Sequence, residues 1–165
     1  MKTPKAAKTR YYFAYGSNCN LDQMERRCPA ARVIGRVTLP NYALSFNGKT
    51  SGWGVANIHR KRGKEVKGLL WAITPECERN LDRYEGYPTL YEKRNVTVRT
   101  EDDATIKAMV YVMTDEHKNP ALPSKGYYEG IVAGFQQNSI PADTVRAALV
   151  EVYNQIEGGG MGCGR

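Results

Sequence analysis

Hydrophobic and polar residues alternate along several stretches of the chain, which is the period-two pattern of strands that bury one face. The alternation is clearest at residues 91–100 and 105–113, which are joined by the short polar segment Glu-Asp-Asp-Ala. This arrangement predicts an antiparallel pair of strands. Shorter apolar runs predict further strands at residues 11–15, 31–39, 42–46, 55–59 and 66–73.

Turn-forming residues set the expected boundaries between these strands. Pro40-Asn41 is expected to separate the strands on either side of it. The basic segment HRKRGKEVK at residues 59–67 has an Arg-Gly-Lys centre, which predicts the tip of a hairpin between the two flanking strands. The glycine-rich segment at residues 48–54 predicts a loop.

Apolar residues that recur with helical spacing predict the helices, of which the clearest lies at residues 75–85. Thr74 is suited to the N-cap, Pro75 to the first helical position and Gly86 to the stop. From Cys77 onward, apolar residues recur at i, i+4 and i+7 and form one face. Further helical segments are expected at residues 21–28, 124–138 and 145–156.

Glu85 falls at the C-terminal end of the helix expected at residues 75–85. A carboxylate there faces the negative end of the helix dipole, an unfavourable placement worth about 0.3–1 kcal/mol. The same placement raises the pKa of the carboxyl. Two interpretations stay open at this point: an exposed glutamate that carries a small penalty, or a functional carboxyl whose raised pKa is used.

These elements together predict an α+β domain. About seven strands, mostly connected as hairpins, and three or four helices favour a compact mixed, mostly antiparallel β-barrel flanked by the helices. We expect a single domain over residues 1–157, with a flexible basic arm at 1–9 and a flexible glycine-rich tail at 158–165.

The composition is that of a soluble globular protein, with 41% hydrophobic and 25% charged residues in a chain of 165. No apolar run approaches the roughly 18 residues of a membrane span, and the basic start of the chain lacks the apolar segment of a secretory signal. These features predict a cytoplasmic protein with no membrane partner. The net charge of +7 is concentrated in the arm and in segment 59–67. Because no recognition helix or aromatic stacking platform accompanies this charge, we expect no nucleic-acid partner.

Cysteine and histidine are sparse and irregularly spaced. The four cysteines form no CxxC motif, and the two histidines are far apart in sequence. This pattern does not favour a metal site. Free, reduced thiols are the expected state of cysteines in a cytosolic protein.

The sequence Phe-Ala-Tyr-Gly-Ser-Asn at residues 13–18 ends the first expected strand abruptly. Glycine, serine and asparagine are common turn residues, so an ordinary strand end is one interpretation. Consecutive backbone N–H groups in such a turn can also bind an anion or an oxyanion. The turn alone does not decide between these interpretations, because the second requires a partner elsewhere in the chain.

Several motifs, taken in order, resemble the gamma-glutamylcyclotransferase family and its AIG2-like relatives. The motifs are YGSN at 15–18, GKTSGWGVANI at 48–58, VKGLLWAI at 66–73, LDRYEGYPTLYEKRNVTV at 81–98, VYVM at 110–113 and PSKGYYEGIVAGF at 123–135. The resemblance extends over about residues 11–141, most of the chain. Some members follow YGSN with leucine, whereas this chain has Cys19-Asn20.

The resemblance implies a compact mixed barrel and an enzyme that converts gamma-glutamyl amines into 5-oxoproline and the released amine. It implies a lyase- or acyltransferase-type reaction with no cofactor and no metal, on a small-molecule gamma-glutamyl substrate, and it leaves a homodimer open. Glu85 would be the catalytic acid/base. The residues that would hold the gamma-glutamyl group are Tyr12, Phe13, Ala14, Tyr15, Gly16, Ser17, Asn18 and Tyr127.

Ring closure to 5-oxoproline requires these types of residue. The α-amine of the substrate attacks its own γ-carbonyl, so positioning alone can supply about 7–11 kcal/mol of the barrier. The amine must lose a proton and the departing amine must gain one, which requires an acid/base of raised pKa such as Glu85. Backbone N–H groups of Gly16, Ser17 and Asn18 could stabilise the oxyanion, each by about 2–4 kcal/mol.

Several residues keep alternative interpretations. Ser17 as a nucleophile would need a nearby base, which the two remote histidines do not supply. Cys19 is either a thiol nucleophile or a small buried residue. Tyr127 contacts either the substrate or only the core, and the loop around Trp53 either lines the pocket or serves only as a hairpin.

Three alternative functions stay open from the sequence. An enzyme of the same chemistry could act on gamma-glutamyl-lysine or on another gamma-glutamyl amine, since loops would build the leaving-group side. A module on the same fold could bind a small molecule without catalysis. A nucleic-acid-binding role based on segment 59–67 would show a steep salt dependence.

Overall fold

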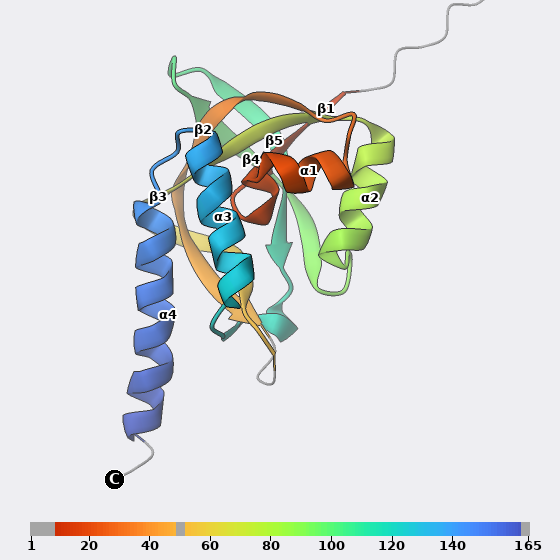
Figure 1. The fold of residues 1–165 in the computed structure, drawn as a ribbon. Coiled ribbons are helices and arrows are strands. Elements are labelled where there is room, and N and C mark those ends of the chain that lie inside the picture. The colour runs from red at the N-terminus through yellow and green to blue at the C-terminus, as the bar shows by residue number, and fades with distance from the viewer. Residues whose placement is uncertain (1–8, 49–51, 163–165) are drawn as a thin grey trace, which may run out of the picture.

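The computed structural model describes residues 9–48 and 52–162 (Figure 1). Within these ranges the chain forms six strands, four α-helices and two short 3-10 helices. The strands are β1 (Arg10–Ala14), β2 (Arg32–Gly48), β3 (Val55–Ile73), β4 (Tyr91–Thr100), β5 (Thr105–Met113) and β6 (Asn119–Pro120). The helices are α1 (Leu21–Arg27), α2 (Pro75–Glu85), α3 (Lys125–Gln137) and α4 (Asp143–Gly162), and the 3-10 helices are η1 (Ser17–Cys19) and η2 (Asp115–His117).

The strands form a closed barrel. β1 lies between β3 and β5, β4 joins β5 to β2, and β2 pairs with β3, so that five strands close on themselves. The contact between β1 and β5 is parallel, whereas the other pairings of the barrel are antiparallel. The predicted mixed, mostly antiparallel barrel with flanking helices is therefore confirmed.

The prediction of about seven strands was wrong where β2 and β3 are concerned. Each runs without a break through the turn expected within it, and the two pair in antiparallel register from Arg32 and Ala72 to Asn47 and Val55. The strands expected at residues 55–59 and 66–73 are therefore parts of β3 and do not pair with each other.

A bulge of four residues in β3 replaces the predicted turns. Pro40 pairs with Glu65 and Tyr42 with Arg60, so residues 61–64 lie opposite a single residue of β2. That residue, Asn41, has a positive φ of 62°. Its Oδ1 accepts a hydrogen bond from the backbone N of Gly63 at 3.2 Å, and the φ of Gly63 is 85°. The same residues that indicated turns thus allow two long strands to bend.

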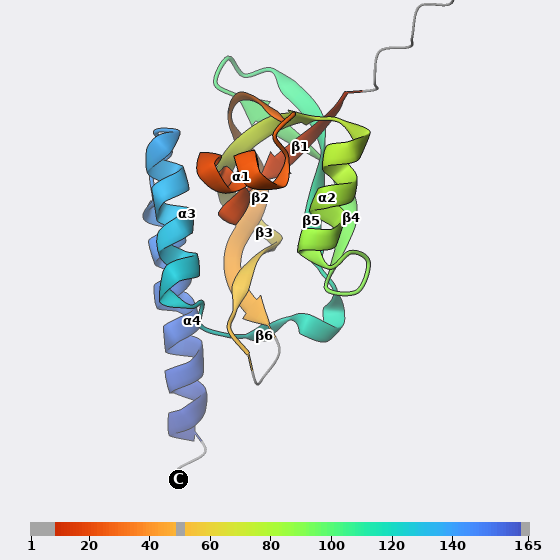
Figure 2. The ribbon, with the colours of Figure 1, turned by 45° about the vertical axis from the view of Figure 1, so that its right-hand side comes forward.

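The helices flank the barrel, with α1 between α3 and α2 (Figures 1 and 2). α3 and α4 lie side by side, and α2 lies on the opposite side (Figures 1 and 2). α4 continues to Gly162, so residues 158–162 are helical within the segment for which the sequence predicts a flexible tail, and the flexibility stays a prediction. Glycine lowers helix stability by about 1 kcal/mol per residue but does not forbid the helix. Residues 163–165 and the arm at 1–9, except Thr9, lie outside the described residues.

Helix α2 has the ends that its sequence predicts. The Thr74 Oγ1 accepts a hydrogen bond from the Cys77 backbone N at 3.2 Å, and Pro75 is the first residue. Gly86 ends the helix in the left-handed conformation with a φ of 66°. Glu85 is therefore the last residue of α2, as expected.

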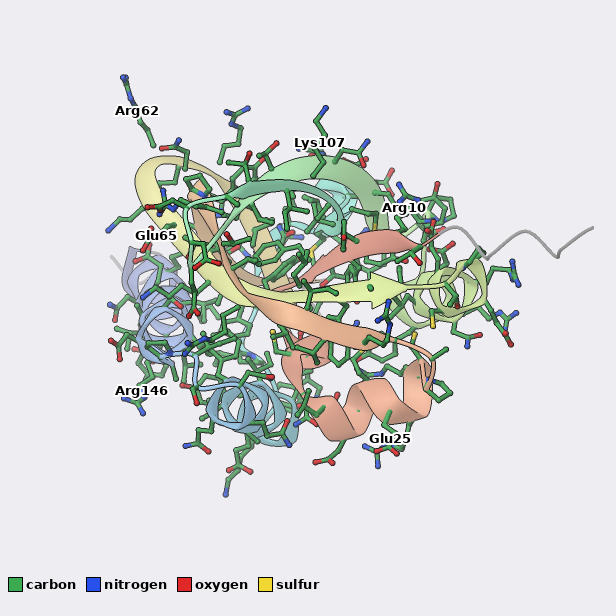
Figure 3. All side chains as sticks on the ribbon, turned by 90° about the horizontal axis from the view of Figure 1, so that it is seen from above. Arg10, Glu25, Arg62, Glu65, Lys107 and Arg146 are labelled. Atoms are coloured by element: carbon green, nitrogen blue, oxygen red, sulfur yellow. The ribbon has the colours of Figure 1, made fainter. Side chains whose placement is uncertain are left out.

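Charged side chains lie on the outside of the barrel, where Arg62, Glu65 and Lys107 point away from it (Figure 3). The core is built from the inward-facing residues of the strands and from one face of each flanking helix. Among residues 9–48 and 52–162, no helix is both long and apolar enough to cross a membrane.

Candidate active site

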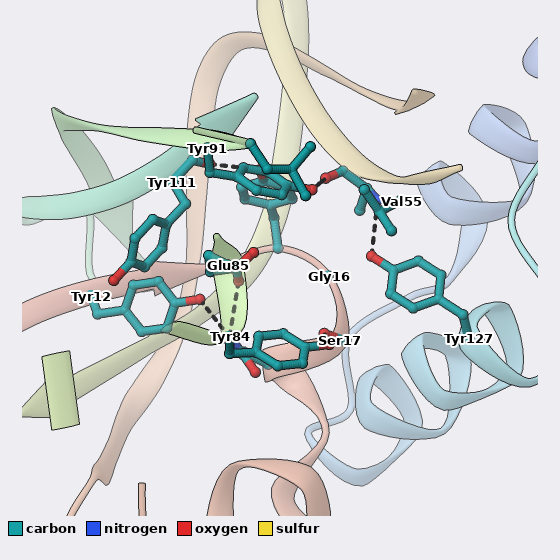
Figure 4. A pocket seen from close by; sticks show the side chains of 13 residues that line it. Tyr12, Gly16, Ser17, Val55, Tyr84, Glu85, Tyr91, Tyr111 and Tyr127 are labelled. Atoms are coloured by element: carbon teal, nitrogen blue, oxygen red, sulfur yellow. Dashed lines mark hydrogen bonds between the residues drawn. The ribbon is translucent and has the colours of Figure 1, made fainter. Parts of the chain in front are cut away.

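A pocket lies where the end of β1, η1 and the C-terminal end of α2 meet (Figure 4). Its volume is about 170 Å³, and β3, β4, β5 and α3 also contribute to its lining. The residues of the lining that the sequence singled out are Glu85, Tyr127 and, from the first turn, Tyr12, Tyr15, Gly16, Ser17 and Asn18. Residues distant in sequence therefore share one cavity.

The turn after β1 is a short 3-10 helix. The backbone N of Cys19 bonds to the Gly16 carbonyl, and that of Asn20 bonds to the Ser17 carbonyl, both at 3.0 Å. The first N–H groups of a helix have no partner within it, which leaves the amides of Ser17 and Asn18 available. Gly16 allows the turn to approach β3 closely, because a Cβ at this position would lie 3.0 Å from the Cβ of Ala56.

Phe13 and Ala14 do not line the pocket, in contrast to the prediction. Side chains alternate across a strand, so the Phe13 ring points away from the face of Tyr12 into the core, where it is fully buried. Ala14 carries only a methyl group. Its carbonyl accepts a hydrogen bond from the Cys19 thiol at 3.2 Å, which helps to hold the turn.

Glu85 and the turn are in direct contact. The Asn18 Nδ2 donates a hydrogen bond to the Glu85 Oε1 at 3.3 Å, shown as a dashed line in Figure 4. Asn18 is 2% exposed, whereas Glu85 stays partly accessible through the pocket that it lines. The glutamate is thus not a freely solvated surface residue.

Burial raises the pKa of the Glu85 carboxyl from 4.5 to about 7, and the positive charge of Arg27 opposes part of this rise. The sequence indicates the helix dipole as a cause of the raised pKa, whereas in the structure the cause of the rise is the removal of the carboxyl from water. At neutral pH both protonation states of Glu85 are therefore populated.

Asn18 connects several parts of the site. Its Nδ2 also donates to the Tyr12 Oη at 2.9 Å, and its Oδ1 accepts from the Arg27 Nη1 at 2.5 Å. Its backbone carbonyl accepts from the Trp71 Nε1 at 3.0 Å. These contacts fix the side chain and the turn together.

Two tyrosines hold the peptide groups of Ala56 at the opposite wall. The Tyr127 Oη accepts a hydrogen bond from the Ala56 backbone N at 2.9 Å, and the Tyr91 Oη donates one to the Ala56 carbonyl at 2.6 Å. Burial raises the pKa of both phenols above the ordinary value of 10.0, so they stay protonated at neutral pH. The hydroxyl proton of Tyr127 therefore remains available for a group in the pocket.

Sequence reasoning missed part of the lining. Tyr111 faces the pocket, and its hydroxyl donates to the Asp82 Oδ1 at 2.5 Å. Period-two alternation does not single out Tyr91, which shares its strand face with Lys93 and Thr97, and the end of β5 around Tyr111 is apolar on both faces. Arg27 gave no signal in the sequence either. Trp53 is 70% exposed and does not line the pocket, although its neighbours Val55 and Ala56 do.

The alternative nucleophiles gain no support from the geometry. The Ser17 Oγ lies 3.1 Å from the Tyr84 Oη and 3.4 Å from the Arg27 Nη1, and neither group is a base. Cys19 is fully buried, and burial raises the pKa of its thiol to about 12. Among the residues with described positions, no group of His, Cys, Asp and Glu side chains could hold a metal ion.

Comparisons with known proteins agree on one family. The family model described as gamma-glutamyl cyclotransferase, AIG2-like, matches residues 12–130. Gamma-glutamylcyclotransferases from Bos taurus and Homo sapiens are 34% and 33% identical over 139 residues, which cover 80% of this chain and 73% of each relative. A solved structure described as gamma-glutamyl cyclotransferase superposes with a TM-score of 0.75 at 31% identity, covering 82% of this chain and 83% of the other.

Proposed function

The chain belongs to the gamma-glutamylcyclotransferase family, and we propose that it releases 5-oxoproline and a free amine or amino acid from a small gamma-glutamyl substrate. The observation that carries this proposal is the position of Glu85, which lines the pocket in contact with Asn18 and has a pKa raised to about 7. A carboxyl that titrates near the operating pH can both accept and return a proton.

The size and lining of the pocket suit an acyl chain that must fold back on itself. Its volume of about 170 Å³ is smaller than the roughly 300–1,000 Å³ of pockets for drug-sized ligands. Glu85 supplies the charged group of the lining, and tyrosines, small residues and aliphatic side chains supply the rest. Confinement between these walls favours the approach of the α-amine to the γ-carbonyl.

In the proposed reaction, Glu85 first removes a proton from the α-ammonium group of the substrate. The neutral amine then attacks the γ-carbonyl, so that a nitrogen–carbon bond forms and closes a five-membered ring. The bond from the γ-carbon to the leaving amine breaks as Glu85 returns the proton to that amine. Glu85 then takes the second proton, which the ring nitrogen must lose to become the lactam N–H, and passes it to the released amine. The products are 5-oxoproline and the free amine, and the carboxyl ends in its starting state.

Charge develops on the γ-carbonyl oxygen during the attack. The free amides of Ser17 and Asn18 at the start of η1 and the hydroxyl of Tyr127 are the donors that we propose for this oxygen. Loss of one such donor typically lowers turnover by about 10²–10³-fold. Binding of this oxygen by the amides of the turn would explain why the first strand ends on Gly-Ser-Asn.

We place the leaving amine toward Tyr84, which lines the pocket and is 43% exposed. Amines of different size could be accommodated there. A free amino acid, lysine linked through its side chain, and a simple amine are thus all compatible with the same proton transfers at Glu85.

The test is to incubate the protein with gamma-glutamyl amino acids, gamma-glutamyl-lysine and gamma-glutamyl amines and to measure 5-oxoproline by mass spectrometry. We expect 5-oxoproline from at least one of these substrates. The matched α-glutamyl dipeptides should give none, because they have no γ-amide to cleave. Absence of product from the whole panel would contradict the proposal and favour a binding module without catalysis.

A further inference from the structure

We infer that Arg27 is a positioning residue of this site: it fixes the orientation of the Asn18 amide and thereby presents a hydrogen-bond donor and a nearby positive charge to Glu85. The inference deepens the proposed function and rests on it for the kinetic consequences. Nothing in the sequence motifs pointed to this arginine.

The guanidinium group of Arg27 lies where two helices meet. Arg27 is the last residue of α1, and its guanidinium carbon lies 3.5 Å from the centroid of the Tyr84 ring on α2. A cation above an aromatic face is attracted by the ring, and the planar guanidinium can stack on it. This contact joins the end of α1 to the end of α2, where Glu85 lies.

The orientation of the Asn18 amide follows from its contact with Arg27. Arginine has only donors, so the atom of Asn18 that lies 2.5 Å from the Arg27 Nη1 must be the carbonyl oxygen. The Nδ2 group then faces the Tyr12 Oη at 2.9 Å and the Glu85 Oε1 at 3.3 Å. If Arg27 were absent, a flip of the Asn18 amide would no longer break the hydrogen bond from Arg27 to the Asn18 Oδ1. The Asn18 Oδ1 could then face the Glu85 carboxylate in place of the Nδ2 donor.

The charge that surrounds Glu85 also involves Arg27. Arg27 lowers the pKa of the carboxyl, against the larger effect of burial. Tyr84 of α2 lines the same pocket. The other titratable groups that interact with Glu85 are phenols whose pKa burial raises: Tyr12 on β1, Tyr15 directly after β1, Tyr91 on β4, Tyr111 on β5 and Tyr127 on α3. These phenols stay neutral where Glu85 titrates, so Arg27 supplies the opposing charge.

Arg27 is not placed to bind the substrate itself. It does not belong to the lining of the pocket, and the Tyr84 ring covers one face of its guanidinium. Its Nη1 is already engaged by Asn18 and, at 3.4 Å, by the Ser17 Oγ. Its effect on the reaction must therefore pass through Asn18 and Glu85.

The kinetic test compares Arg27→Met, Arg27→Lys and the control Arg26→Met, which replaces the exposed neighbour on the same helix. Loss of the positive charge of Arg27 should raise the pKa of Glu85 and so move the acidic limb of the pH profile of kcat/KM to higher pH by about one unit. If the midpoint of the acidic limb moves from about 7 to one unit higher, kcat/KM at pH 7 falls roughly fivefold, and this loss becomes smaller as the pH rises. Arg27→Lys should restore the position of the limb, and Arg26→Met should match the wild type.

Two kinetic outcomes would overturn the inference. A uniform loss of activity with an unmoved acidic limb would indicate a purely structural role. A raised KM alone, again with an unmoved limb, would indicate direct contact with the substrate. Thermal unfolding checks that each variant is folded, and Arg27→Gln takes the place of Arg27→Met if the methionine variant does not fold.

A second measurement does not depend on activity. The Glu85 carboxyl carbon can be titrated by NMR and assigned by its loss in Glu85→Gln. We expect a higher midpoint in Arg27→Met than in the wild type, and recovery in Arg27→Lys; an equal midpoint in all three would overturn the inference. If the wild type formed no 5-oxoproline from any substrate, the proposed function would fail, while this titration would still decide the role of Arg27.

Discussion

At the scale of single residues, a carboxyl that exchanges protons near neutral pH must lie where its charged form is poorly solvated. Glu85 meets this condition because the pocket walls remove most of its water, while Asn18 and Arg27 keep the anion from becoming too unfavourable. The balance leaves the pKa at about 7.

We predict that Glu85→Gln stabilises the folded protein at alkaline pH. Because the pKa of Glu85 is about 7 in the folded chain and its ordinary value is 4.5, the folded state binds more protons between these values. The stability that this proton contributes is present in full below about 4.5 and is lost as the pH rises through about 7. At about 1.36 kcal/mol per pH unit, the loss is at most about 3 kcal/mol.

Urea denaturation of both proteins at pH 5 and pH 8 measures this effect. The wild type should lose stability relative to Glu85→Gln between the two pH values, and other titrating groups cancel in the difference. A difference between the two proteins that does not change with pH would show that Glu85 titrates normally.

A second residue-scale prediction concerns Tyr127. Tyr127→Phe removes the hydroxyl that accepts from the Ala56 backbone N and that we propose donates to the substrate. We expect kcat to fall about 10²–10³-fold, with a loss of stability of about 1 kcal/mol for the unpaired amide. Tyr128→Phe is the matched control, because the Tyr128 ring packs against Phe46, with centroids 6.3 Å apart. Equal kcat values for Tyr127→Phe and Tyr128→Phe would show that Tyr127 serves only as a core residue.

At the scale of elements, the end of α2 sets the position of Glu85. Gly86 has a φ of 66°, and a Cβ there would lie 3.2 Å from the Leu90 Cβ. We predict that Gly86→Ala lowers the free energy of unfolding by roughly 1–2 kcal/mol, the cost of a left-handed conformation for a residue with a Cβ. Thermal or urea unfolding would measure it.

The control for this substitution is Gly126→Ala on α3, where an added Cβ meets no atom within 4 Å. It should leave stability unchanged or slightly raised, since alanine favours the helix. If both substitutions had the same effect, the strained cap would not be what ends α2.

The elements differ in how far the sequence predicted them. β4, β5 and α2 appear with the expected bounds, because alternation and cap residues act locally. β2 and β3 do not, because Pro40, Asn41 and Gly63 favour turns, whereas Asn41 and Gly63 use their positive φ in a bulge between the two strands. Only pairing with the partner strand decides between these outcomes.

At the scale of the whole molecule, closing the barrel brings the site together. β1 and β5 pair in parallel, and the pocket opens where the end of β1 meets the C-terminal end of α2 (Figure 4). Residues 15–18 and Glu85 were predicted to meet because the motifs resemble one family. Composition and periodicity alone do not give that contact, because it depends on strand order.

The walls of the pocket were the least predictable part of the molecule. Tyr91, Tyr111 and Ala56 come from three strands, and their convergence follows from the register of the barrel rather than from any local pattern. Arg27 reaches the site only because α1 packs against the end of α2. Such contacts become visible only in three dimensions.

The most direct measurement of the central claim is 5-oxoproline formation by the wild type and by Glu85→Gln, side by side, on the best substrate of the panel. Glutamine has the same shape and can still accept the Asn18 hydrogen bond, but it cannot take a proton. We predict an intact fold and a loss of turnover of at least about 10²-fold. Near wild-type turnover in a folded Glu85→Gln variant would contradict the account.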